Sequence, residues 1–325
     1  MILGLVGATG VVGGEIVSLL QERRVAIAQL RLFASDGSAG SPIDWFEDEI
    51  MVEALEPGSL ADCDLVIYAA PRNESLLAEL RAADVALVDL SGALEADEEV
   101  RLVAGSISTP GKADPHVAIA RGISVGIALV LRALSQEVQF QRASIVVLEG
   151  ASGLGRPGLD TLTEQTVRVL NAMDGGALDG GVFPQALAFD CVPQVGELTD
   201  DGGTDEEERL AFVLRRLLND PELELAVTRV RVPIYVGSLA TLHLDLSAEL
   251  SAARAERLLR ESPEIDVRLG ADLPSPRGAS GRDQVVVGRI RAAGSQLALV
   301  LAQDDLRRGA ALGAVETVEM RLADA

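Results

Sequence analysis

The first third of the chain alternates short apolar runs with stretches of helical periodicity. An apolar run at residues 2–6 leads into a glycine-rich segment at 7–14, and residues 15–20 continue with apolar positions at helical spacing. Similar strand-like runs follow at 29–33, 50–54, 65–69, 86–90 and 101–103, and a helical pattern lies at 74–82. Strands that alternate with helices predict an α/β fold with a doubly wound, mostly parallel sheet.

From Ser144 onward the predicted strands become longer and the pattern less regular, which is typical of an α+β domain. We predict strands at 227–236 and 241–246, helices at 159–172 and 206–218, and loops at 196–208 and 270–282. The closing stretch, 304–320, is predicted to be a helix with a face of small residues that packs tightly against the first domain.

The glycine-rich segment after the first predicted strand has the spacing of a dinucleotide site. Its glycines let the backbone turn tightly, approach a pyrophosphate and start a helix whose N–H groups face the anion. The alternative is a tight turn that binds nothing. The predicted loop comprises Gly7, Thr9, Gly10, Val11, Val12 and Gly13.

Composition narrows the classes of partner. Acidic residues outnumber basic ones by 50 to 28, for a net charge of −22, and no Lys/Arg block offers a face for nucleic acid. The first strand starts at residue 2 and no apolar run approaches membrane-spanning length, so we expect a cytoplasmic protein with no membrane partner. Cys63 and Cys191 have neither metal-ligand nor disulfide spacing; we expect two small core residues and no metal site.

Nine segments, taken in order along the chain, resemble aspartate-semialdehyde dehydrogenase, which reductively dephosphorylates aspartyl phosphate with NADPH. Each is common alone, but the ordered set is specific, above all Arg-Val-Pro at 231–233 and Gly-Arg-Ile-Arg at 288–291. The segments are residues 7–13, 38–40, 89–93, 152–155, 183–185, 188–194, 231–233, 287–291 and 306–312.

The resemblance implies a Rossmann-type dinucleotide-binding domain formed by residues 1–121 together with 307–325. Residues 122–306 would then form a second, α+β domain like the C-terminal domain of glyceraldehyde-3-phosphate dehydrogenase. In the family this domain supplies a large dimer interface, so we expect a homodimer.

The same resemblance indicates that the catalytic pair is missing. The family's nucleophile is a cysteine at the start of a helix, where the helix end lowers the thiol pKa, and alignment puts Gly122 at that position. The general acid/base is a histidine seven residues after the arginine of Arg-Val-Pro, and counting from Arg231 gives Ser238. His243 lies at an odd offset from Ser238, so on a strand it would face the opposite side of the sheet.

Other substrate-side positions depart from the family as well. Glu149 corresponds to a glutamine that orients the thioester, and Glu95 corresponds to an arginine that grips the substrate phosphate. Arg231, Glu206 and Arg209 match the groups that would meet the substrate carboxylate, amino group and phosphate. The alternative for these three, which we favour, is that they are ion-paired or solvated scaffold residues.

The cofactor site is expected to be weakened. The family reads the 2′-phosphate of NADP with a serine-rich loop that carries an arginine, and the matching loop here contains Ser35, Gly37 and Ser38, with glycine in place of the arginine. Asp36 would repel a phosphate but could accept a hydrogen bond from a ribose hydroxyl, which makes NAD as well as NADP possible. The remaining cofactor positions implied by the resemblance are Ser152, Gly153 and Gly313.

These departures resemble those of the Usg-type paralogues, which keep the dehydrogenase fold without its catalytic pair. Our first hypothesis is a catalytically inactive homodimer that binds a nucleotide or a small metabolite. The alternatives are an active NAD(P)-dependent aspartate-semialdehyde dehydrogenase that uses other residues, and a scaffold whose glycine loop is empty.

Overall fold

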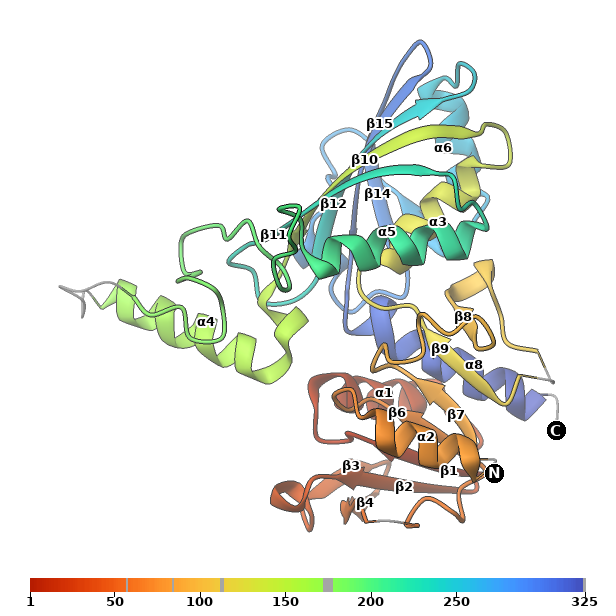
Figure 1. Ribbon diagram of the computed structural model, residues 1–325, viewed down its shortest axis with the longest axis vertical. Coiled ribbons are helices and arrows are strands. Elements are labelled where there is room, and N and C mark those ends of the chain that lie inside the picture. The colour runs from red at the N-terminus through yellow and green to blue at the C-terminus, as the bar shows by residue number, and fades with distance from the viewer. Residues whose placement is uncertain (57, 84, 112–113, 172–177, 324–325) are drawn as a thin grey trace. The chain divides into compact units, whose positions relative to one another are not determined.

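The computed structural model describes residues 1–56, 58–83, 85–111, 114–171 and 178–323. The chain forms two compact units, Met1–Arg121 with Ala310–Ala325 and Gly122–Gly309 (Figure 1). The first is built on a parallel sheet and the second on a mixed sheet with helices, so the predicted α/β class is confirmed.

The first unit is built on a seven-stranded sheet in the order β5-β2-β1-β6-β7-β9-β8, and every neighbouring pair is parallel. The central strands read as continuous apolar runs because helices cover both faces of the sheet. A separate antiparallel hairpin is formed by β3, Pro42–Trp45, and β4, Asp48–Met51. The sheet strands are β1 Ile2–Val6, β2 Gln29–Ala34, β5 Glu53–Ala54, β6 Leu65–Tyr68, β7 Ala86–Asp89, β8 Arg101–Val103 and β9 His116–Ile119.

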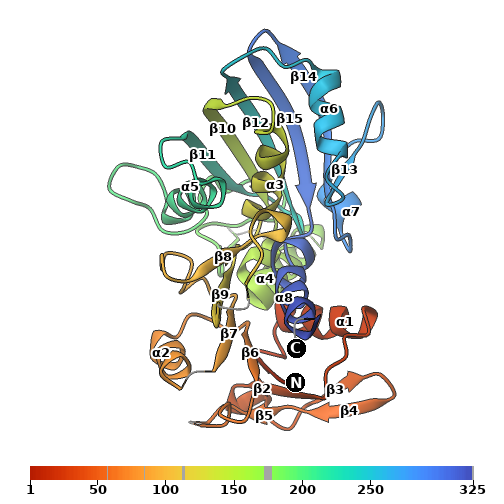
Figure 2. The ribbon, with the colours of Figure 1, turned by 90° about the vertical axis from the view of Figure 1, so that its right-hand side faces the viewer.

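Helices cover this sheet from two sides. α1, Val11–Glu22, and α8, Leu312–Ala323, lie side by side on one face, and α2, Glu74–Ala82, lies on the other (Figure 2). The core on the α1 side takes in Ala311 and Ala314 from the C-terminal segment. The predicted single helix at 304–320 is wrong in its first part, because Arg307–Ala311 form a π-helical turn that precedes α8.

The second unit is built on a six-stranded mixed sheet in the order β11-β10-β12-β15-β14-β13, whose strands stand side by side in Figure 2. The packing helices are α3, Ser124–Leu134, α5, Asp205–Leu218, and α6, Ala252–Arg260. The remaining helices are α4, Gly155–Leu170, and the short α7, Pro276–Ala279. The strands are β10 Phe140–Glu149, β11 Glu224–Arg231, β12 Ser238–Leu246, β13 Ile265–Val267, β14 Val285–Ala293 and β15 Gln296–Gln303.

Several predicted boundaries are wrong, and local chemistry explains two of them. The strand predicted at 50–54 is interrupted at Val52, which lies between β4 and β5. Its backbone hydrogen-bonds to Gly40 and Ser41 and belongs to neither strand. The strand predicted at 227–236 ends at Arg231, because Pro233 has no N–H to donate to a ladder. The predicted loop 270–282 contains α7, and the predicted helix 159–172 starts earlier, at Gly155, with residue 172 outside the described residues.

A capping box fixes the start of α5. The Thr204 hydroxyl accepts a hydrogen bond from the Glu207 N–H at 3.3 Å, and the Glu207 carboxylate accepts one from the Thr204 N–H at 3.0 Å. The same carboxylate also accepts from the Arg229 N–H of β11 at 2.8 Å. The box therefore sets the position of the first turn of α5 against the edge strand.

We expect Thr204→Ala to lower the free energy of unfolding by about 1 kcal/mol, because the Glu207 N–H loses its side-chain acceptor and the capping box is broken. Thr204→Ser keeps the hydroxyl and is the control. The measurement is the urea midpoint of both variants; equal midpoints for the alanine and serine variants would contradict the role of the cap.

Candidate functional site

The turn after β1 approaches the neighbouring backbone closely. Gly7 has φ +88°, and a Cβ there would lie 2.6 Å from the Ala69 carbonyl oxygen, so only glycine fits. The Gly7 and Ala8 N–H groups both donate to the Phe33 carbonyl, at 2.8 and 3.2 Å, which ties this turn to the end of β2. The predicted loop is thus built at the carboxyl edge of the parallel sheet, where open α/β sheets bind ligands.

The N-terminus of α1 is free of competing groups. No side chain caps it, no acidic residue lies in its first turn, and Thr9 and Gly10 are exposed. Val11 and Val12 are half-buried at the start of the helix, and Gly13 is buried against the turn. An uncapped helix start with exposed backbone amides suits a pyrophosphate.

The second predicted cofactor loop follows β2. Ser35 precedes a short 3₁₀ turn at Asp36–Ser38, and residues 35–37 are exposed. A Cβ at Gly37 would have no atom within 4 Å, so the loop leaves open space where the resemblance places an arginine. Asp36 therefore supplies the charge at this point of the loop.

Two further predicted positions lie inside the first unit. The Glu95 side chain is buried, and its carboxylate pairs with Arg121 at 3.2 Å. Sequence reasoning missed Arg121, a cation that follows β9 and lies against Gly92. Gly313 is buried on α8, where a Cβ would lie 3.0 Å from Ile119.

In the second unit, four buried residues form one row across adjacent strands. Arg231 of β11 pairs with Glu149 of β10, Glu149 pairs with Ser238 of β12, and Ser238 pairs with Gln303 of β15. Partners directly opposite in neighbouring strands share a face of the sheet. His243 is exposed, on the other side of β12 from the buried Ser238, as its odd offset predicts.

Glu149 is held between two arginines. Its carboxylate accepts hydrogen bonds from Arg231 at 3.0 Å and from Arg229 at 2.5 Å. The Arg231 guanidinium also donates to the Gly150 carbonyl at 2.7 Å. Burial lowers the pKa of Arg229, but the carboxylates of Glu149 and Glu206 outweigh it and leave that pKa above its usual value.

The predicted substrate groups on α5 join the same network. Glu206 accepts from Arg229 at 2.5 Å and from Arg209 at 2.9 Å. Gly153 lies directly over the Glu149–Arg231 pair: a Cβ there would be 2.5 Å from the carboxylate and 2.6 Å from the guanidinium. The neighbouring Ser152 hydroxyl is buried without a hydrogen-bond partner in the described part of the chain. The charges of Arg231, Glu206 and Arg209 are thus engaged by the protein.

Gly122 lies just before α3 in a left-handed conformation, with φ +60°. A Cβ built there has no atom within 4 Å, so the position faces open space although its backbone favours glycine. Its N–H donates to the Gly309 carbonyl at 2.7 Å, and its carbonyl accepts from the Gln303 amide at 2.6 Å. Two hydrogen bonds therefore hold this turn in place.

Asp305 completes the cluster beside Ser238. One oxygen of its carboxyl accepts a hydrogen bond from the Ser238 hydroxyl, and the other accepts from the Gln303 amide at 3.1 Å. Burial, followed by the negative charge of Glu149, raises the pKa of Asp305 to about 7. The carbonyl oxygen of the Gln303 side chain is buried without a partner among the described residues.

Arg229, Gln303 and Asp305 are site residues that the sequence analysis missed. Arg229 precedes Arg231 by two residues on one strand, so the period of two could have found it. Gln303 enters the row only through the pairing of β12 with β15, which no local pattern reveals. Asp305 follows β15 in a turn whose direction depends on that same pairing.

Other chemistry is sparse in the described residues. They contain no group of three His, Cys, Asp or Glu side chains placed to hold a metal ion, and no helix among them is long and apolar enough to cross a membrane. Cys63 is buried, and burial raises the pKa of its thiol. The expectation of a core position is wrong for Cys191, which is exposed beside the bridge between Val192 and Arg231.

Comparison with known proteins matches both units to one family. Residues 2–112 match the NAD binding domain of semialdehyde dehydrogenase, and residues 131–308 match its dimerisation domain. The chain is 33% identical to an aspartate-semialdehyde dehydrogenase of Streptomyces akiyoshiensis, with 100% of this chain and 99% of the relative covered.

Two more relatives span the whole chain. A USG-1 protein homolog of Azotobacter vinelandii is 32% identical over 98% of this chain and 96% of its own. The structure of aspartate semialdehyde dehydrogenase II from Vibrio cholerae, complexed with ASA, has a TM-score of 0.92 at 27% identity, covering 99% of this chain and 98% of that one. The chain therefore belongs to the semialdehyde dehydrogenase family, with its NAD binding and dimerisation domains.

Proposed function

We propose that this protein is a dinucleotide-binding homodimer that does not perform the acyl transfer of an aldehyde dehydrogenase. The supporting observation is the state of the two positions that the resemblance assigns to a cysteine and a histidine. Gly122 offers no side chain, and the Ser238 hydroxyl donates a hydrogen bond to the Asp305 carboxyl. A thioester needs a thiolate at the first position, and proton transfer near pH 7 suits an imidazole at the second.

The charges around this site also oppose a substrate role. Glu149 is hydrogen-bonded to Arg231 and Arg229, and Glu206 is shared by Arg229 and Arg209. A substrate carboxylate would have to displace buried, hydrogen-bonded partners, and breaking a buried pair typically costs about 3–5 kcal/mol. In the first unit the phosphate-gripping position is held by Glu95, already paired with Arg121.

We infer that the dinucleotide is NAD rather than NADP. The turn at Gly7–Gly10 and the uncapped start of α1 suit the pyrophosphate that both cofactors share. Asp36, at the end of β2, suits a ribose diol and would repel a 2′-phosphate. The site is weakened for NADP because Gly37 leaves no cation in this loop.

The open face of the second sheet supports a homodimer. α3, α5 and α6 pack against one face, while β10 and β15 carry half-exposed apolar side chains on the other. Val146 is 40% exposed there, and its direct partners on the neighbouring strands are Thr228 and Thr241. A half-apolar face of this kind suits a second copy of the sheet. Light scattering tests this, and a monomer at micromolar concentration would contradict it.

Two observations favour the alternative of an active aspartate-semialdehyde dehydrogenase. Asp305 titrates near neutral pH and can exchange a proton, and Cys191 is an exposed thiol next to the strand bearing Arg231. The scaffold alternative requires only that the glycine loop stay empty. Turnover with aspartate semialdehyde and binding of NADH or NADPH distinguish the three functions.

The purified protein is expected to show no phosphate-dependent NADP or NAD reduction with aspartate semialdehyde. Gly122→Cys alone should not produce turnover, because Ser238 still replaces the base, and the φ of +60° should cost about 1–2 kcal/mol in a non-glycine residue. Gly122→Ala, which adds the same strain without a thiol, is the control for stability. Wild-type turnover would overturn the proposal, and its loss in Cys191→Ala would assign it to that thiol.

Calorimetric titration should show NADH binding more tightly than NADPH. Asp36→Asn should improve NADPH binding about tenfold, because it removes a negative charge beside the 2′-phosphate. The matched control is Asp48→Asn, which removes an exposed carboxylate of β4 in the same unit. Tighter binding of NADPH to the wild type would refute the preference, and no binding of either cofactor below millimolar concentration would favour the scaffold.

The carboxyl of Asp305 should make stability depend on pH. Its pKa is about 7 in the folded protein and lies near the ordinary value of 3.8 when unfolded. Between these values the folded chain binds a proton that the unfolded chain does not, so its stabilising contribution is complete below about pH 4. It is lost as the pH rises through 7.

Asp305→Asn should therefore raise the melting temperature relative to wild type by several degrees at pH 8 and by much less at pH 5, because asparagine carries no charge to bury. Asp160→Asn, which neutralises an exposed residue of α4, is the control. A difference between Asp305→Asn and wild type that does not change with pH would show that Asp305 does not titrate in this range.

A further inference from the structure

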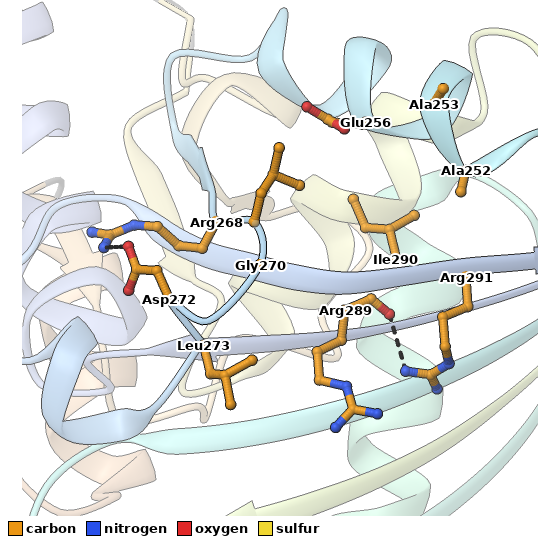
Figure 3. A pocket seen from close by; sticks show the side chains of 11 residues that line it. Ala252, Ala253, Glu256, Arg268, Gly270, Asp272, Leu273, Arg289, Ile290 and Arg291 are labelled. Atoms are coloured by element: carbon orange, nitrogen blue, oxygen red, sulfur yellow. Dashed lines mark hydrogen bonds and ion pairs between the residues drawn. The ribbon is translucent and has the colours of Figure 1, made fainter.

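A groove of about 490 Å³ lies at the β13 edge of the second sheet (Figure 3). The start of α6, the loop at 268–273 and the bulged part of β14 at 289–291 form its walls. None of these segments contributes to the buried row at Glu149 and Ser238. The Gly-Arg-Ile-Arg motif supplies the β14 wall and has no part in the function proposed above.

The loop wall is tightly fixed. The Arg268 N–H donates to the Val287 carbonyl at 2.7 Å, and a Cβ at Gly288 would lie 2.9 Å from Pro274 and 3.0 Å from the Arg268 carbonyl. Arg268 is further held by Asp266 at 2.7 Å and by Asp272 at 2.5 Å. The groove is therefore preformed in this structure, and its volume is that of a small-molecule site.

Two arginines of the groove have no counter-charge among the residues that the structure describes. Asp272 is engaged by Arg268, and Glu256 is engaged by Arg260 at 2.9 Å. Arg289 and Arg291 have no acidic partner in the described part of the chain. Their guanidinium groups lie on the same side of β14, away from Glu256 (Figure 3), and Arg291 also donates to the Arg289 carbonyl at 3.1 Å. In a chain of net charge −22, this is a local excess of positive charge.

The backbone at Arg289 favours a glycine. Its φ is +53°, and it lies in a β-bulge between Gly288 and Arg291, a position where a left-handed residue is normally glycine. An arginine at this position adopts a backbone conformation that costs a residue with a side chain more than it costs glycine. Strain of this kind, found next to a groove, points to a function for the side chain.

Apolar side chains line the rest of the groove. Leu269 and Leu273 are 55% and 54% exposed, which is unusual for large aliphatic residues so close together. Ile290 points toward α6 from the opposite wall (Figure 3). Ile290 is turned away from the two guanidinium groups, so Leu269 and Leu273 are the apolar residues that the groove offers beside these arginines.

We propose that this groove binds a small amphipathic anion, with its carboxylate or phosphate on Arg289 and Arg291 and its apolar body against Leu269 and Leu273. Charge-assisted hydrogen bonds from guanidinium groups orient the anionic end, and burial of leucine surface adds affinity for the apolar end. The site is separate from the dinucleotide loop and from the residues at Gly122. Arg291 lies opposite Ala298, on the sheet face proposed for the homodimer but on β14, which is separated from β10 and Val146 by β12 and β15.

Calorimetry on the full-length protein with hexyl phosphate, inorganic phosphate and 1-hexanol tests the proposal. Hexyl phosphate should bind most tightly, because it alone satisfies both surfaces. Arg289→Gly and Arg291→Gln should each weaken its binding about tenfold, the loss expected for one charge-assisted hydrogen bond. Arg257→Gln, which removes an exposed arginine on the same helix as Glu256, is the matched control and should bind as wild type.

Arg289→Gly should also raise the melting temperature, since glycine relieves the left-handed conformation, so weaker binding there cannot come from unfolding. Unchanged binding of hexyl phosphate in both variants would overturn the proposal. If inorganic phosphate bound as tightly as hexyl phosphate, the leucines would contribute nothing to binding, and the apolar part of the proposal would be wrong. If both variants weaken dimerisation and leave hexyl phosphate binding intact, the groove holds a second copy of the chain and the small-anion site is refuted.

Discussion

The buried carboxylate of Glu149 determines the chemistry of the second unit. It occupies the centre of the row that crosses four strands, it holds Arg229 and Arg231 by hydrogen bonds, and its charge contributes to the raised pKa of Asp305. A buried ion pair gains stability only when its hydrogen bonds are complete. Here both arginines donate to the carboxylate, and Glu206 adds a second negative charge beside Arg229. The network is closed, and the proposed loss of substrate binding follows from that closure.

Glu149 lies between two kinds of charged group. On one side lie groups of fixed charge, Arg231 and Arg229, and on the other lies a group that changes charge near neutral pH, Asp305. Because the Ser238 hydroxyl and the Gln303 amide both donate to Asp305, ionisation strengthens their hydrogen bonds while burial opposes the charge. The Gln303 amide that donates to Asp305 also donates to the Gly122 carbonyl, so the turn at Gly122 and Asp305 share one donor on β15.

How much the sequence reveals depends on the range of the interaction. The alternation of apolar runs predicts the parallel sheet of the first unit, because its central strands, such as β1 and β6, are apolar on both faces. Counting from Arg231 leads to Ser238 because the motif and the position lie on one continuous segment. Gln303 and Asp305 could not be found this way, since they reach Ser238 only through strand pairing between segments far apart in the chain. The end of β11 was misjudged because the apolar pattern continues past Arg231, while Pro233 stops the ladder.

The positions where the chain leaves and re-enters the second unit add one consequence. Gly122 and Gly309 are the first and last residues of that unit, and they are joined by a backbone hydrogen bond. An uninterrupted segment whose two ends meet has the layout of an insertion into a host domain, a layout in which each part can keep its own core. If relatives exchanged this segment, the parallel sheet of the first unit and α8 would both remain intact. Such an arrangement allows the nucleotide unit and the dimerisation unit to diverge at different rates.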